Sequence, residues 1–97
     1  MRNYEVILIV NPELDETAVN GLVEKVKGWI TDAGSTVTKV DVWGKRRMAY
    51  QIRKQREGQY VYIQADIAPS FINELERNLR FLEPVMRFLI TCVPANA

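Results

Sequence analysis

Hydrophobic and polar residues alternate with two different periods along this chain of 97 residues. Four segments are rich in β-branched and aliphatic side chains: residues 4–10, 36–50, 59–67 and 85–92. The third alternates strictly between apolar and polar positions, and a period of two residues is typical of a half-buried strand. The first is apolar on both faces, which favours a central position in a sheet. We therefore expect four strands, with a bulge or bend near Val40 and Gly44, where the alternation of the second segment slips.

Two segments between these strands have the helical period. Asp15 and Glu16 mark the start of the first helix and Gly34 marks its end. Its predicted buried face comprises Leu14, Ala18, Leu22, Val26, Trp29, Ile30 and Ala33. Pro69 and Ser70 open the second helix, and the helix must stop before Pro84. Its predicted core positions are Ile72, Leu75, Leu79 and Leu82.

The order of elements is therefore β-α-β-β-α-β, which is typical of an α+β fold. Right-handed crossovers place both helices on one face of a four-stranded antiparallel sheet, the ferredoxin-like arrangement. We expect residues 1–93 to form a single domain, followed by a short C-terminal tail at 94–97. Residues 53–58 should form a polar turn between the two middle strands. The second face of the sheet is left open, and it is available to a partner.

Charge is distributed unevenly along the chain. The net charge is only +1, yet six of the thirteen Lys and Arg residues lie between Trp43 and Arg56, and no acid lies between Asp41 and Glu57. We call residues 43–56 the basic ribbon. A nearly neutral protein with one cationic segment favours local contact with a polyanion over general nucleic-acid binding. The alternative is a solvated edge strand, in which cations block unwanted sheet pairing.

The facing of the basic ribbon follows from strand parity. Met48 and Ile52 share one parity and are the better core residues, so we expect Arg47 and Arg53 to face outward on the open face. Arginine can fork onto phosphate oxygens, so a phosphate-binding role suits these side chains. The candidate RNA-binding residues are Arg2, Lys45, Arg46, Arg47, Arg53, Lys54, Arg56 and Arg87.

The open face should also carry an apolar patch. Its candidate members, which we assign to a partner-protein surface, are Ile7, Ile9, Tyr60, Tyr62 and Leu89. Exposed aliphatic patches meet protein more often than nucleic acid. Base stacking on Tyr60 and Tyr62, as in RNA-recognition motifs, remains an alternative, although the first strand offers no aromatic residue to that face.

Few residues suit catalysis or metal binding. The chain has no histidine, and its one cysteine, Cys92, shares a parity with Phe88 and Ile90 and is expected to be a small core residue. No glycine-rich phosphate loop occurs. We therefore expect no enzyme activity, no metal, no cofactor and no small-molecule substrate. A single cysteine, and no apolar run long enough to span a bilayer, favour a cytoplasmic protein without membrane contact.

Residues 44–53, with the sequence GKRRMAYQIR, resemble the signature of the bacterial small-subunit ribosomal protein S6 family. That signature runs glycine, any residue, a basic residue, a polar one, leucine, serine or alanine, tyrosine, any residue, isoleucine and a basic or small residue. Only Met48 departs from it, and methionine has a volume close to that of leucine. The start of the chain, MRNYE followed by an aliphatic strand and Asn11-Pro12, is also similar to the family.

The resemblance implies a structural protein of the small ribosomal subunit. Members of this family bind the central domain of small-subunit (16S) rRNA together with ribosomal protein S18, as a heterodimer. Two other functions are compatible with the fold alone: a ferredoxin-like regulatory module that binds a ligand and dimerises, and a small acyl-phosphate hydrolase. Both need a specialised loop after the first strand, and residues 11–14 do not provide one.

Overall fold

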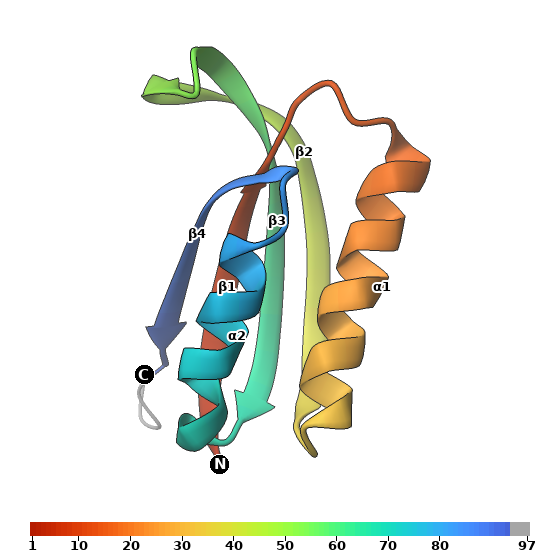
Figure 1. The fold of residues 1–97 in the computed structure, drawn as a ribbon, viewed down its shortest axis with the longest axis vertical. Helices are drawn as coiled ribbons and strands as arrows, with labels where there is room; N and C mark the ends of the chain where they lie inside the picture. Colours follow the sequence, from red (N-terminus) through yellow and green to blue (C-terminus); the bar gives the residue numbers. More distant parts are fainter. Residues whose placement is uncertain (94–97) are drawn as a thin grey trace.

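The computed structural model describes residues 1–93 and has the predicted order of elements (Figure 1). The strands are β1 (Arg2–Val10), β2 (Thr36–Ile52), β3 (Gln55–Ile67) and β4 (Val85–Cys92). The helices are α1 (Glu16–Asp32) and α2 (Ile72–Arg80), and a short 3-10 turn, η1 (Pro69–Phe71), precedes α2. Both helices lie on the same face of the sheet, which confirms the ferredoxin-like fold. The predicted tail at 94–97 lies outside the described residues, so the domain boundary stays a prediction.

The sheet has the strand order β2-β3-β1-β4, and every neighbouring pair is antiparallel. β1 pairs with β3 on one side and β4 on the other, as its two apolar faces predict. Ile7 lies opposite both Tyr62 and Leu89 in this register. Residues far apart in sequence are thereby brought together on the open face.

The core lies between the sheet and the two helices. Alternate residues of β1 and β3 are fully buried there, namely Val6, Leu8, Val10, Val61, Ile63, Ala65 and Ile67. Leu75 and Leu79 of α2 cover them, as predicted, while Ile72 and Leu82 pack at the edge of this core. In α1 the buried residues are Val19, Leu22, Val23, Val26 and Ile30.

The predicted buried face of α1 was partly wrong. Ala18 and Ala33 are exposed, whereas Val19 and Val23 are buried. The residues that face the sheet are spaced by three and four positions from Val19, which puts Ala18 at the margin of this face, whereas Ala33 lies just beyond the last helical residue, Asp32. Larger side chains take the central positions because they remove more apolar surface from water.

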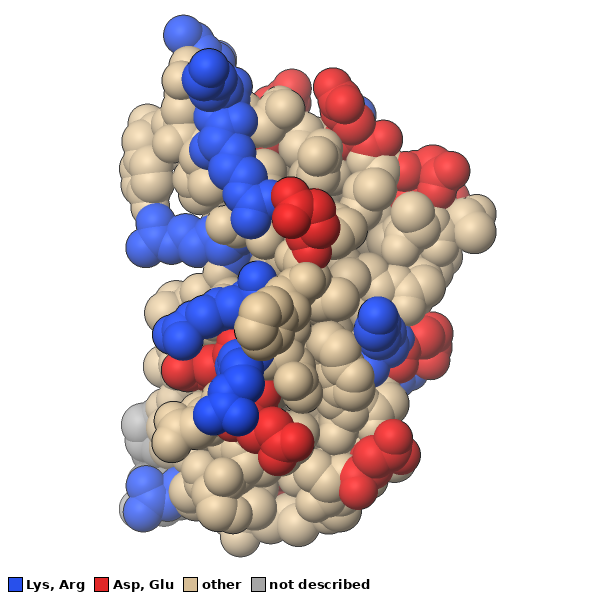
Figure 2. All heavy atoms as spheres, in the orientation of Figure 1, with Lys and Arg blue, Asp and Glu red and all other residues tan. Residues whose placement is uncertain are grey.

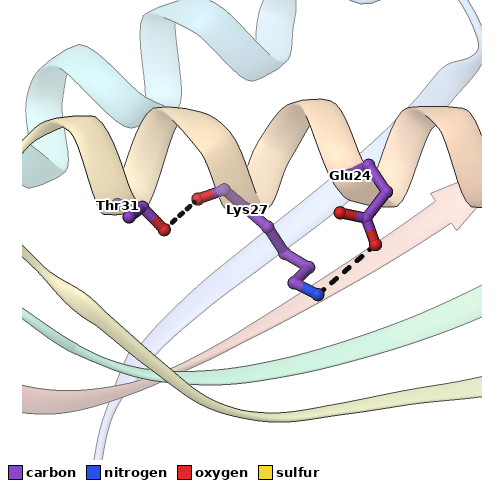
Figure 3. A network of polar contacts seen from close by, with 3 residues as sticks. All are labelled: Glu24, Lys27 and Thr31. Atoms are coloured by element: carbon purple, nitrogen blue, oxygen red, sulfur yellow. Dashed lines mark hydrogen bonds and ion pairs between the residues drawn. The ribbon is translucent and has the colours of Figure 1, made fainter.

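Local signals define the ends of α1. The Asp15 carboxylate accepts a hydrogen bond from the backbone N–H of Ala18 at 2.8 Å, which makes Asp15 the N-cap. Gly34 follows the helix with φ of 81°, as predicted for the residue after the C-cap. Away from the core, Lys27 Nζ lies 3.4 Å from Glu24 Oε1. The Thr31 hydroxyl donates a hydrogen bond to the Lys27 carbonyl at 2.8 Å (Figure 3).

The hairpin between β2 and β3 is longer than predicted. Its turn consists only of Arg53 and Lys54, whose φ angles are 50° and 66°, and β3 begins at Gln55. Two successive residues with positive φ match the twist of a tight hairpin. The tip extends beyond the helices and curls toward the β4 side of the sheet (Figure 1). No helix covers the tip, so neither face of its strands is selected for apolar residues. The sequence there lacks the alternation by which a strand is recognised.

α2 also ends earlier than predicted, at Arg80 rather than next to Pro84. Within the described residues, neither helix is long and apolar enough to cross a membrane.

Candidate nucleic-acid interface

The hairpin carries most of the exposed positive charge. Within residues 1–93, five of its cations are exposed and form no ion pair with a carboxylate: Lys45, Arg46, Arg47, Lys54 and Arg56. Figure 2 shows a run of Lys and Arg side chains that extends from the hairpin tip at the upper left down the left side of the molecule. Unpaired cations that project from the core are available to an external polyanion.

The predicted facing of Arg47 was wrong, because Met48, from which it was inferred, is buried on the open side of the sheet and not in the core beneath the helices. A bulge sets the facing of this part of β2. The register shifts between Val42 and Gly44, Gly44 has φ of 80°, and Trp43 is the extra residue. After the bulge, Arg46 lies opposite Gly58 and therefore shares its face, which is the open one. Arg47, at the opposite parity, points away from the open face. One inserted residue reverses the facing of every residue that follows it.

Met48 is buried, as predicted, but it is not part of the core between sheet and helices. Its sulfur, Ile9 Cγ2 and Met86 Cε all lie within 3.5 Å of the position that a Cβ atom on Gly58 would occupy. A Cβ atom at Gly58 would lie 2.5 Å from Ile9 Cγ2, so only glycine fits. Ile52 is half-buried and also lies outside the core. The base of the hairpin therefore has its own small apolar cluster on the open side.

Arg53 has contacts within the chain. Its Nη1 donates to the Glu83 carbonyl at 2.8 Å and its Nη2 donates to the Val85 carbonyl at 3.3 Å. Nη1 also lies 3.7 Å from the Glu83 carboxylate. These contacts tie the hairpin turn to the connection between α2 and β4. Binding of phosphate by Arg53 stays a prediction, with part of its guanidinium already engaged.

The other two candidate cations belong to other strands, Arg87 to β4 and Arg2 to β1. Arg87 faces the open side, opposite Ile9, and its guanidinium lies over the ring of Tyr50, 5.7 Å from the centroid, and donates to the Tyr50 hydroxyl. Arg2 lies opposite Ile67, at the end of the sheet remote from the hairpin. The structure therefore brings Arg87 close to the hairpin and leaves Arg2 separate.

The predicted apolar patch is present on the open face. It surrounds a hollow of about 260 Å³ lined by Ile7, Ile9, Tyr50, Tyr60, Arg87, Phe88 and Leu89. Leu89 is 58% exposed, an unusual value for a leucine in a sheet. Four of the five residues assigned to the partner surface line this hollow, and Tyr62 lies opposite Ile7 in the register.

Trp43 is a further residue of this face, which strand parity alone did not single out. Its ring stacks on Tyr62, at 5.6 Å between centroids and 11° between planes, and on Tyr60, at 6.4 Å and 14°. A hydrogen bond to the Glu5 carboxylate, with burial and the charges of Glu5 and Asp41, raises the pKa of Tyr62 to about 12. A tryptophan beside a glycine within a strand is the signal that could have revealed it, since the bulge turns its ring to the open face.

Gln59 and Cys92 lie outside the candidate interface. The amide of Gln59 is buried and donates to the carbonyls of Asn11 at 3.2 Å and Leu14 at 2.8 Å, which fixes the turn after β1. The expectation that Cys92 is a core residue was wrong, because its side chain is exposed at the end of β4. β4 is an edge strand of the sheet, and Cys92 is its last residue. Among the described residues, no group of three or more His, Cys, Asp or Glu could hold a metal ion.

Comparison with known proteins identifies the class of protein. The family described as "Ribosomal protein S6" matches residues 3–91. The small ribosomal subunit protein bS6 of Moorella thermoacetica is 50% identical over 97 residues, which is 100% of this chain and 99% of the relative. Its counterpart in Cutibacterium acnes is 49% identical over 87 residues, covering 90% of this chain and 91% of the relative.

A solved structure agrees with both. The crystal structure of 30S ribosomal protein S6 from Thermotoga maritima superposes with a TM-score of 0.89 at 31% identity, covering 95% of this chain and 87% of that one. The chain is thus a structural protein of the small subunit of the cytoplasmic ribosome and not an enzyme. It belongs to the ribosomal protein S6 family, as the motif at residues 44–53 predicts.

Proposed function

We propose that this protein binds the central domain of 16S rRNA together with ribosomal protein S18, with which it forms a heterodimer. The observation that carries the proposal is the group of five exposed, unpaired cations on one projecting hairpin. In a ribosomal protein of the S6 family, the available polyanion is RNA. Contacts of Lys and Arg with phosphate position a protein on RNA without reading its sequence.

The net charge of +1 supports RNA binding shared with a partner protein rather than RNA binding by this protein alone. Affinity for RNA grows with the number of phosphates that the protein neutralises, and one hairpin can reach only a few. A basic partner held beside the hairpin would supply the remaining contacts. Tyr50 of the hairpin contacts Arg87 on the open face, so the hairpin lies beside the surface where such a partner would bind.

The open face has the properties of a protein interface. Its hollow of about 260 Å³ has apolar walls, with Arg87 among its lining residues. Burial of an apolar side chain in such a hollow contributes affinity, and the surrounding polar groups give specificity. We assign Ile7, Ile9, Tyr60, Tyr62 and Leu89 to the S18 interface on this basis.

Salt dependence tests the RNA-binding half of the proposal. The double variant Arg47→Ala/Lys54→Ala should lower the slope of log affinity against log salt by about one to two, close to one for each phosphate that is no longer neutralised. Binding is measured on a central-domain RNA fragment in the presence of S18. Arg80→Ala is the matched control, because Arg80 is exposed on α2 and pairs with Glu76. Equal slopes for the double variant and the original protein would remove both residues from the RNA interface.

A pair of exposed apolar residues tests the S18 half. Leu89→Asp places a charge on the open face and should abolish heterodimer formation in calorimetry. Phe81→Asp places the same charge on a residue that is 81% exposed at the end of α2, and it should have no effect. If both variants bind S18 as well as the original protein, the open face is not the interface.

A further inference from the structure

The open face is divided into chemically different zones. The hollow and the basic hairpin occupy one end, whereas Glu5, Asp41 and Asp66 lie toward the other, where β1 begins. The aromatic stack of Trp43, Tyr60 and Tyr62 lies between them. Trp43 is 42% exposed although its ring packs on the two tyrosines. An indole exposed to this extent is costly to leave in water, which favours a partner group that covers it.

Two carboxylates flank this stack. Asp41 lies directly opposite Tyr62 in the register of β2 and β3, and Glu5 lies opposite Gln64, two residues along β3 from Tyr62 and on the same face. Lys39 lies 3.4 Å from Asp41, but both side chains of this pair are about half exposed, so the pair is weak and can rearrange. Within residues 1–93, Arg87 and Lys25 stack on other rings, and Trp43 has no cation over it.

We infer that Trp43, Tyr62 and Glu5 form a binding site for an arginine side chain of the partner protein. The inference rests on the proposed function and specifies which chemistry S18 brings to this part of the interface. A guanidinium group is planar, weakly hydrated and always charged, so it can stack on the exposed indole and donate hydrogen bonds to a carboxylate at the edge of the ring. Lysine is a strongly hydrated point charge, so it stacks less well on the indole and makes a less specific contact with the carboxylate than arginine does.

Charge decides between an arginine and a nucleotide as the occupant. A base stacked on Trp43 would bring its phosphate within about 10 Å of Glu5 and Asp41, close to the Debye length of about 8 Å at physiological salt, so the like charges would repel with only partial screening. Apart from Lys39, which pairs with Asp41, the cations of β2 begin at Lys45, after the bulge and on the side away from Glu5. A cationic side chain satisfies both the aromatic surface and the carboxylates. The site therefore complements a basic protein rather than RNA.

Heterodimer affinity tests the inference in solution, with purified S18 as the probe. Trp43→Leu and Glu5→Gln should each weaken S18 binding by about tenfold, the effect expected of a cation–π contact and a charged hydrogen bond at a partly desolvated site. Trp43→Phe should retain most of the affinity, because it keeps an aromatic face. Val42→Ala is the matched control, since Val42 is 49% exposed, adjacent in β2 and on the opposite face. Thermal unfolding of every variant checks that the fold is kept.

The arginine itself is found by changing the arginines of S18 to lysine one at a time. One such S18 variant should bind the original protein about tenfold more weakly than unchanged S18 does. The same S18 variant and unchanged S18 should bind the Trp43→Leu protein with equal affinity. Additive effects for every arginine would overturn the inference. So would S18 binding unaffected by Trp43→Leu, or a Trp43→Leu variant that loses affinity for RNA alone, since the latter assigns the ring to a base. In all three cases S18 still binds, so the proposed heterodimer stands; complete absence of S18 binding by the original protein would instead reject the proposed function.

Discussion

The guanidinium of Arg53 donates a 2.8 Å hydrogen bond to the backbone carbonyl of Glu83, joining the tip of the basic hairpin to the connection that follows α2. A second bond, to the Val85 carbonyl, runs to the start of β4. The hairpin extends beyond the helices, so little apolar burial holds its tip. The hydrogen bonds of Arg53 therefore determine where the cations of the ribbon lie.

Removal of these hydrogen bonds should loosen the hairpin without unfolding the protein. Arg53→Ala is expected to cost about 1–2 kcal/mol, the value of charged hydrogen bonds reduced for a half-exposed side chain. Amide hydrogen exchange should become faster in residues 44–58. Glu83→Gln removes only an ion pair whose acidic side chain is 95% exposed, and its effect should be below about 0.5 kcal/mol. Equal effects of the two variants would mean that the ion pair, and not the bonds to the carbonyls, holds the tip.

Gly58 should not tolerate a side chain. Gly58→Ala places a methyl group 2.5 Å from Ile9 Cγ2 and 3.3 Å from Met86, and the overpacking should cost about 1–3 kcal/mol in urea unfolding. Adding Ile9→Ala should relieve the clash, so the combined destabilisation should be smaller than the sum for the single variants. Gly21→Ala, in α1 with no atom within 4 Å of the new methyl group, should stabilise the protein by about 0.5–1 kcal/mol.

Gln59 should be important for the turn after β1. Gln59→Leu leaves the carbonyls of Asn11 and Leu14 without their donor in a buried position, and the expected cost is about 1–3 kcal/mol. Gln51→Leu, at an exposed position of the hairpin, should change stability by less than about 0.5 kcal/mol. Similar values for the two variants would show that the buried amide adds no stability.

Tyr62 should make the fold sensitive to alkaline pH. Its pKa rises from 10.0 to about 12 because the hydroxyl donates to Glu5. The folded state holds this proton more tightly than the unfolded state, so the stabilisation is complete below about pH 10 and is lost as pH rises toward 12. The stability difference between the original protein and Tyr62→Phe should therefore shrink over that range, and Glu5→Gln should show the same convergence. A difference that stays constant from pH 9 to 12 would contradict the Glu5–Tyr62 bond.

Sequence periodicity predicted the elements that pack against the core. In β1 and β3 one face is buried beneath the helices, so alternation such as Val61, Ile63, Ala65 and Ile67 reports the structure directly. The predicted bulge near Gly44 is confirmed by the register. Its consequence for facing could not be counted from the sequence, because a bulge inserts its residue at one of several neighbouring positions.

The hairpin tip and the margins of the sheet were predicted less well. Arg47 and Arg53 were assigned to the open face because Met48 and Ile52 were expected in the core, but both of these lie outside it and Met48 is buried on the open side. Cys92 has the parity of a core residue but lies at the end of the edge strand β4, where its side chain is exposed. Pattern-based prediction thus failed where no second layer covers the strand.

This protein and S18 are proposed to bind RNA jointly. The most direct test is the affinity for a central-domain 16S rRNA fragment at physiological salt, measured with this protein alone, with S18 alone and with both. We expect weak binding by each protein separately and binding at least about a hundredfold tighter by the two together, since each then supplies part of one phosphate-binding surface. If this protein alone binds the RNA tightly and S18 does not change the affinity, the claim of joint RNA binding is contradicted.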